Sequence, residues 1–120
     1  MANIQDALQG IERVFDPHFP HAPPDWRRET AVDMARQEQL TLGDDHWAVV
    51  RGLQEFFARH EYGVVNLREL YDALEEKFHH KGGMKYLYTL LPGGPIAQGC
   101  RLAGLKPPAG ATDLSFGSVA

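Results

Sequence analysis

Apolar and polar residues follow each other along most of this chain with the period of an α-helix. From residue 25 onward the apolar positions recur three or four residues apart, which is typical of helices that bury one face. Glycine and proline interrupt the pattern at several points and divide it into separate segments. The pattern therefore predicts a mainly α-helical protein.

Two helices are predicted between residues 25 and 63. Asp25 is a suitable N-cap for a helix that continues to about Glu38, and the acidic pair Asp44-Asp45 suits the first turn of the next helix. Gly63 is expected to end that second helix. The expected buried stripes are Trp26, Ala31, Met34 and Ala35 in the first helix, and Trp47, Val50, Leu53, Phe56 and Phe57 in the second.

Three further helices are predicted downstream. Asn66 and Glu69 resemble a capping box for a helix that ends before Gly82-Gly83. A short helix follows from residue 84 to 91, and Pro95 suits the first position of a last helix, to about residue 102, with Gly104 as its cap. The residues expected to face inward are Leu67, Leu70, Tyr71, Leu74 and Phe78, then Tyr86, Leu87 and Leu90.

The two ends of the chain lack a clear helical pattern. Gly10 and four prolines interrupt residues 1–24, so an irregular or hairpin-like segment is expected there. After Leu105 no periodic apolar face remains, and Pro107-Pro108 favours an extended arm. The 120 residues suit one domain, with an N-terminal segment (1–24), a helical bundle (25–104) and a C-terminal arm (105–120).

Composition narrows the class of protein. Apolar residues make up 43% and charged residues 23%, as in ordinary globular proteins. The only cysteine, Cys100, excludes an internal disulfide and fits a reducing compartment. The N-terminus lacks the features of a secretory signal and no long apolar run occurs, so a cytoplasmic protein that does not bind membranes is predicted. No cofactor is expected.

Charge is distributed unevenly around this cysteine. Residues 1–76 hold fifteen acids against seven bases, whereas residues 77–120 hold five bases against Asp113 alone. A basic surrounding favours the thiolate form of a cysteine and attracts anionic ligands or an acidic partner surface. The bases of this C-terminal part are Lys77, Lys81, Lys85, Arg101 and Lys106.

The run KYLYTLLPGGPIAQGCRLAGLKPPAGA, residues 85–111, resembles the C-terminal signature of the DsrC/TusE sulfur-carrier family, which includes the gamma subunit of dissimilatory sulfite reductase. A weaker resemblance continues upstream through DWRRETAVDMARQEQLTLGDDHW, residues 25–47, and the whole covers about residues 12–111. The resemblance implies a compact, mainly α (α+β) bundle, partly similar to a winged helix, with a small N-terminal β-hairpin and a mobile C-terminal arm.

The resemblance also implies sulfur chemistry on the arm. Sulfite-reductase partners of this family hold sulfur as a trisulfide between two arm cysteines, whereas members that act in tRNA thiolation keep the cysteine near the end and carry a persulfide on it. This chain matches the upstream position with Cys100 and has Ala111 at the other. Because Ala111 has no sulfur, neither an internal disulfide nor a trisulfide can form. Residues 112–120 continue past the point where such chains normally end.

The expected site is therefore Cys100 as the sulfur-carrying nucleophile. Lys85, Arg101 and Lys106 are expected to support its thiolate or to bind partners, and Gly93, Gly94, Pro95, Gly104 and Ala111 mark the arm. Two effects oppose this chemistry. A position near a helix C-terminus disfavours negative charge, and burial would make the thiol inert.

Three functions stay open. The first is a sulfur-relay protein, a sulfurtransferase-like carrier without its own substrate pocket, that takes a persulfide on Cys100 from a donor protein and passes it to an acceptor. The second is a carrier-deficient paralogue that acts as a binding or regulatory module. The third is a helix-turn-helix DNA-binding protein built from residues 43–60 and 66–81, which the acidic second helix disfavours.

Two other groups of side chains carry weaker signals. His18, His21, His79 and His80 are potential metal ligands, but no accompanying motif supplies the three or four converging donors that a site needs, so no metal is expected. Glu75 and Glu76 are adjacent on a helix and diverge around its axis, so they are expected to form a solvated face rather than an acid pair.

Overall fold

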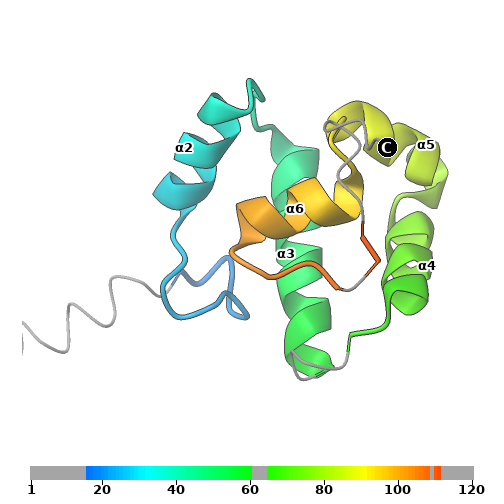
Figure 1. Ribbon diagram of the computed structural model, residues 1–120, viewed down its shortest axis with the longest axis horizontal. Helices are drawn as coiled ribbons and strands as arrows, with labels where there is room; N and C mark the ends of the chain where they lie inside the picture. Colours follow the sequence, from blue (N-terminus) through cyan, green and yellow to red (C-terminus); the bar gives the residue numbers. More distant parts are fainter. Residues whose placement is uncertain (1–15, 61–64, 109, 112–120) are drawn as a thin grey trace, which may run out of the picture.

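The computed structural model describes residues 16–60, 65–108 and 110–111 of the chain. This part is helical and contains no strand, which confirms the mainly α fold (Figure 1). The elements are α2 (Arg28–Gln37), α3 (Asp44–Arg59), α4 (Leu67–Lys77), the short 3-10 helix η2 (His79–Lys81), α5 (Met84–Leu90) and α6 (Pro95–Ala103).

Helix α6 is the centre of the molecule. It crosses α3 and lies between α2 on one side and the pair α4 and α5 on the other (Figure 1). Gly99 permits this close crossing, because a Cβ atom at this position would lie 2.8 Å from Cδ1 of Leu53. The fully buried side chains of α3 and α5, among them Leu53 and Leu87, pack around α6 and form the core.

The start of α2 differs from the sequence expectation. The N-cap position is Arg27, in an extended conformation, and not Asp25. Trp26 is buried as expected, but it precedes the helix, and its indole Nε1 donates a hydrogen bond of 2.7 Å to the carbonyl of Leu102. The long-range bond from Trp26 holds the chain extended across α6, so the helix begins two residues later than an Asp25 cap would place it.

The ends of α3 and α4 follow the sequence more closely. α3 ends at Arg59 with His60 as its C-cap, and the expected stop at Gly63 lies outside the described residues. The Asn66 side chain accepts a hydrogen bond of 3.0 Å from the amide of Glu69, so the N-cap of α4 is confirmed. α4 then gives way to η2 before the two left-handed glycines that were expected to follow, Gly82 and Gly83.

Tyr71 and Glu75 on α4 do not lie where the sequence predicted. Tyr71 is 40% exposed rather than inward, unlike the buried Leu70 and Leu74 beside it. Glu75 is partly exposed, with 43% of its side chain accessible, but its carboxylate also accepts a hydrogen bond of 2.8 Å from the amide of Met84 at the start of α5. Glu75 therefore caps the next helix, a role that depends on a chain reversal not visible in the local sequence.

The segments before α2 and after α6 both contact the helical body. Residues 16–24 form turns and bury Phe19, whose ring lies 5.0 Å from the Arg28 guanidinium and 5.2 Å from that of Arg51. The expected N-terminal hairpin is not confirmed, since residues 1–15 lie outside the described part. In the expected arm, Leu105 is buried and Ala111 packs against the core. The mobility of the arm stays a prediction.

Candidate functional site

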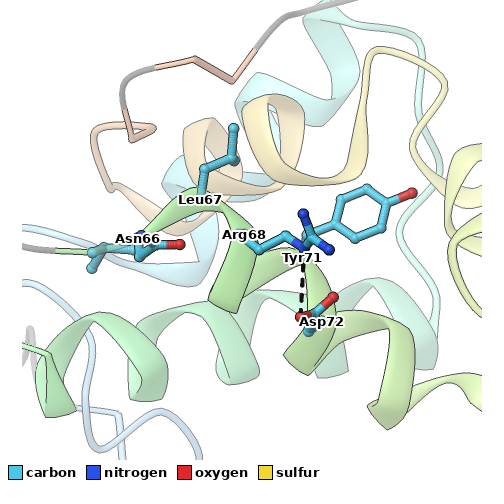
Figure 2. A pocket seen from close by; sticks show the side chains of 6 residues that line it. Asn66, Leu67, Arg68, Tyr71 and Asp72 are labelled. Carbon is cyan, nitrogen blue, oxygen red and sulfur yellow. Dashed lines mark ion pairs between the residues drawn. The ribbon is translucent and has the colours of Figure 1, made fainter.

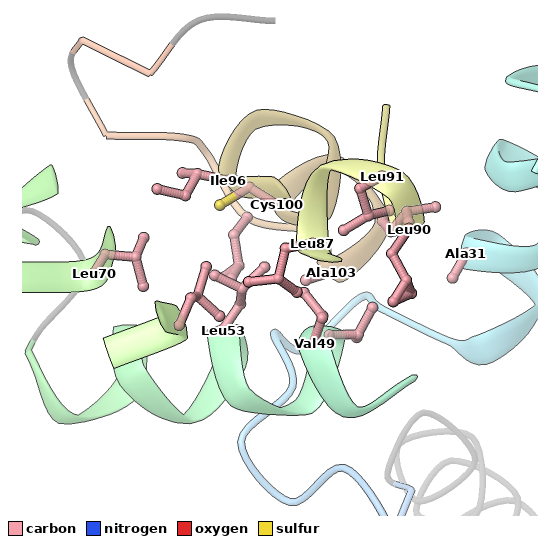
Figure 3. Close-up of a cluster of buried hydrophobic side chains, with 14 of the residues drawn as sticks. Ala31, Val49, Leu53, Leu70, Leu87, Leu90, Leu91, Ile96, Cys100 and Ala103 are labelled. Atoms are coloured by element: carbon pink, nitrogen blue, oxygen red, sulfur yellow. The ribbon is translucent and has the colours of Figure 1, made fainter. Parts of the chain in front are cut away.

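Cys100, the cysteine singled out by the sequence, lies in the last turns of α6 and points into the core. Its exposed fraction is 0% and its thiol is free. Figure 3 shows the sulfur among aliphatic side chains from several helices, close to Ile96 of its own helix and above the residues of α3. The side chain therefore packs as a small apolar core residue.

The environment of this thiol disfavours ionisation. Burial raises the pKa of Cys100 to about 12, far above the neutral range. Desolvation of the buried sulfur is the cause of this shift, and no basic neighbour offsets it. The expected support of a Cys100 thiolate by basic neighbours therefore stays a prediction. In this conformation the thiol is neither ionised at neutral pH nor accessible to a second protein.

Arg101, the expected supporting cation that follows Cys100 in the sequence, pairs with a carboxylate. Its guanidinium makes a bidentate pair with the carboxylate of Glu38, at 3.0 and 3.1 Å, just after α2. Gln98 donates to the same carboxylate at 2.6 Å and accepts from the amide of Gly93 at 2.8 Å. We call Glu38, Gln98 and Arg101 the Glu38 clamp. It joins the end of α2, helix α6 and the turn between α5 and α6.

The C-terminal end of α6 is held by a second set of bonds. Its last carbonyl groups have no partner within the helix and need one elsewhere. The Trp26 indole donates to the carbonyl of Leu102, and Gln54 Nε2 donates to that of Ala103 at 3.0 Å. Gly104 adopts the left-handed conformation expected of a cap, with φ of 77°. The C-terminal end of α6, close to Cys100, is thus tied to Trp26 and to α3.

The two expected lysines are on the surface. Lys85 and Lys106 are both exposed, and burial accounts for the raised pKa of Cys100 with no offsetting contribution from either lysine. Lys81, another base of this region, pairs with Asp45 at 2.9 Å, and the Tyr86 hydroxyl donates to the same carboxylate. Among the described residues, the expected cluster of cations around the thiol is therefore not assembled.

Of the expected arm landmarks, Gly94, Pro95 and Ala111 border a common cavity, whereas Gly93 lines a different one and Gly104 packs against Trp26. Gly94 has a positive φ of 107° and Pro95 occupies the first position of α6, as expected. Gly110 and Ala111 lie beside the start of α6 and border a cavity of about 220 Å³. The other residues that line it are Leu67 and Tyr71 of α4, Met84 and Tyr88 of α5, and Ile96 and Ala97 of α6.

A second, larger cavity adjoins the first on α4. It has a volume of about 780 Å³ and is lined by Val65, Asn66, Leu67, Arg68, Tyr71 and Asp72 (Figure 2). Leu67 and Tyr71 border both cavities, and we call the combined surface the α4–α5 groove. Tyr71 and Tyr88, at 40% and 37% exposure, belong to the few large apolar side chains that the described residues expose. The helical spacing predicts a buried Tyr71, so nothing in the sequence indicates this surface.

Neither a metal centre nor a membrane span is evident in the described part of the chain. Within it, no three side chains of histidine, cysteine, aspartate or glutamate come close enough to hold a metal ion together. None of its helices combines the length and the apolar character that crossing a bilayer requires. The prediction that the protein needs no metal stays a prediction.

Comparison with known proteins agrees with this fold. The family model described as "DsrC like protein" matches residues 14–111. The sulfurtransferase TusE of Photorhabdus laumondii is 38% identical over 85 residues, which span 70% of this chain and 76% of that protein. TusE of Escherichia coli is 37% identical over 84 residues, covering 69% of this chain and 76% of its own.

Solved structures of the same family are also similar. The NMR structure of DsrC from Allochromatium vinosum matches with a TM-score of 0.61 and 34% identity, covering 84% of this chain and 87% of that one. The crystal structure of the oxidized gamma-subunit of the dissimilatory sulfite reductase from Archaeoglobus fulgidus matches with a TM-score of 0.57 and 30% identity, covering 73% and 81%. On sequence and fold together, the chain belongs to the DsrC-like family.

Proposed function

We propose that this protein acts in a sulfur relay of the DsrC/TusE type as a docking component that does not present an exposed thiol. The family relationship supports a sulfur-relay function of the DsrC/TusE type. The observation that carries the docking role is the complete burial of Cys100, whose pKa of about 12 leaves it protonated. Because a buried, protonated thiol cannot exchange sulfur with another protein, we infer that the protein contributes to the relay by binding other components.

The partners proposed are other sulfur-transfer proteins. The relatives are named as sulfurtransferases, and one structural neighbour is named as the gamma-subunit of the dissimilatory sulfite reductase. The α4–α5 groove supports such docking, because exposed tyrosines next to an apolar cavity are common at protein interfaces. A sulfite reductase-like protein or a relay component is the finer proposal, and its location in the cytoplasm stays a prediction from sequence.

A second candidate is the transfer of sulfur through Cys100 itself. It is favoured by one fact, that any thiol chemistry of this chain must use Cys100, the only cysteine. The Cys100 thiolate would attack the outer sulfur of a donor persulfide, form a new S–S bond and release the donor as a thiolate. This step requires α6 to move, because the sulfur is enclosed and the Glu38 clamp holds the helix in place.

The DNA-binding alternative gains no support. Glu69, Asp72 and Glu76 all lie exposed on α4, the helix that would enter the groove of the DNA. Phosphate contacts require positive charge on that surface. That DNA is not a partner stays a prediction.

Intact mass spectrometry separates the first two candidates. The folded protein is incubated with a persulfide donor and weighed, beside the Cys100→Ala variant and beside wild-type protein unfolded in urea. The proposed docking role predicts no added sulfur on the folded wild type and one added sulfur on the unfolded chain. Addition of one sulfur to the folded wild type, with none on Cys100→Ala, would establish the carrier role instead.

Binding to purified sulfur-transfer proteins tests the docking role directly. Replacement of Tyr71 and Tyr88 by serine removes the exposed apolar side chains of the α4–α5 groove and should weaken binding about tenfold or more. Val32→Ser is the matched control, since Val32 is 37% exposed on α2, outside the groove. Equal binding by the groove variant and the control would rule out this surface as the docking site.

A further inference from the structure

The α4–α5 groove has an apolar floor that continues from one cavity to the next. Leu67 and Tyr71 form the wall common to both, with Met84 and Ile96 on the side of the smaller cavity. Figure 2 shows the Tyr71 ring and the Leu67 side chain projecting from the same surface of α4. An open apolar surface of this kind is stabilised when another apolar segment covers it.

The described chain ends inside this groove. Gly110 is so close to α4 that a Cβ atom there would lie 3.2 Å from Cδ2 of Leu67. The amide of Ala111 donates to the carbonyl of Pro108 at 3.1 Å, which closes a turn, and Ala111 borders the smaller cavity. Ala111, the last described residue, therefore lies next to the apolar wall of the groove.

The next nine residues, TDLSFGSVA, have a composition that fits this surface. They lie outside the described residues and beyond the part matched by the family model, which ends at residue 111. In an extended segment Leu114 and Phe116 project to the same side, because alternate residues share a face. Nine extended residues reach about 30 Å, enough to pass along α4.

Charge also fits. The segment contains one charged side chain, Asp113, two residues after Ala111. Arg68 borders the larger cavity with 85% of its side chain exposed, and its contact with Asp72 spans 3.9 Å. A second carboxylate arriving at this point would meet a cation held only by a long, solvated ion pair.

We propose that residues 112–120 bind in the α4–α5 groove of their own chain, with Leu114 and Phe116 against Leu67 and Tyr71 and with Asp113 near Arg68. Covalent linkage makes this binding efficient, since a short tether gives an effective concentration on the order of millimolar. The bound segment covers Tyr71 and competes with any partner for the groove. This last consequence rests on the proposed docking function, whereas the binding of the segment does not.

A spin label tests the contact in the full-length protein. Ser118→Cys introduces a second thiol, and the burial of Cys100 confines labelling to the new site. The label should strongly broaden the NMR amide signals of Leu67 and Tyr71 and leave that of Val32 on α2 unchanged. Equal effects on all three amides, or no effect on α4, would overturn the proposal.

Two further measurements, on variants of the C-terminal segment and on diluted labelled protein, test whether another segment or a second copy occupies the groove instead. Leu114→Ser with Phe116→Ser should abolish the broadening at Leu67 and Tyr71, whereas Ser115→Ala, which lies between them and faces the other way in an extended segment, should preserve it. Broadening that falls on dilution with unlabelled protein would indicate a second copy in the groove and contradict the proposal. None of these measurements requires a sulfur donor or partner, so they succeed or fail independently of the proposed relay function.

Discussion

Two surfaces of α6 lie a few residues apart in sequence and differ in whether solvent and partner proteins can reach them. The surface that carries Cys100 is packed against α3 (Figure 3), whereas the N-terminal end of the same helix borders the open α4–α5 groove. Both belong to the stretch that first suggested sulfur chemistry. The contrast shows that resemblance to a reactive arm does not make a cysteine reactive, because access depends on what packs against it.

The sealed surface owes its stability to two kinds of contact. Apolar side chains such as Leu53 and Leu87 exclude water from the thiol. The Glu38 clamp and the bonds from Trp26 and Gln54 then hold the helix from the outside. Among the described residues the groove has neither an apolar cover nor a comparable set of bonds, so Tyr71 and Tyr88 stay partly exposed there.

Leu53→Ala, which removes a side chain from the buried surface, should have the largest effect on stability. The side chain is fully buried beneath Gly99 of α6, so its truncation leaves a cavity and should lower the free energy of unfolding by about 2–5 kcal/mol. Urea denaturation measures the loss. A change below about 1 kcal/mol would mean that α6 is not packed on α3 as described.

Glu38→Gln should open the sealed surface at a smaller cost in stability. Loss of the charge breaks the bidentate pair with Arg101 and should lower the free energy of unfolding by about 1–2 kcal/mol, since the pair is partly solvated. Cys100 should then react faster with a thiol reagent in native buffer. Glu76→Gln, at an exposed position on α4, is the matched control and should leave both quantities unchanged.

A pH series on Asp45→Asn tests the ion pair that joins α3 to η2 and α5. Hydrogen bonds from Lys81 and Tyr86 lower the pKa of Asp45 in the folded protein. A lowered pKa contributes stability above the pKa of the unfolded chain, about 3.9, and that contribution disappears as the pH falls through the folded value. The variant should be less stable than wild type at neutral pH, and the difference should shrink in acid. A difference that stays constant down to strong acid would show that the pair contributes nothing.

Tyr71→Ser should have the smallest effect on stability. The side chain is partly exposed and borders the groove, so the free energy of unfolding should change by about 0.5 kcal/mol or less. Loss of partner binding without loss of stability would sharpen the contrast between the two surfaces. A large destabilisation would place Tyr71 in the core, as the helical spacing had suggested.

Most helix positions could be read from the sequence. Asn66 caps α4, Pro95 begins α6 and Gly104 ends it, because each of these roles depends on the backbone of the residue and its immediate neighbours. The buried stripe of α3 was also correct at Val50, Leu53 and Phe57. Spacing identifies an apolar face wherever a helix has only one side to bury.

The errors have a common cause. Asp25 was expected to start α2, but Trp26 is drawn to α6 by a bond across 76 residues. Tyr71 has the spacing of a core residue, yet no element covers it in the described structure. Glu75 was expected in solvent and caps α5. In each case a contact from a distant segment, or its absence, decides the position of the side chain.

The residue types and their order are enough to place the helices, to match the family and to exclude a disulfide, because these depend on local backbone chemistry and on which atoms are present. The state of Cys100 depends on packing. Its raised pKa follows from burial of the thiol between α6 and the helices packed against it. One bond that holds α6 joins Arg101 to Glu38, 63 residues away in the chain. Desolvation is a property of the whole surrounding shell, and only the folded chain assembles that shell.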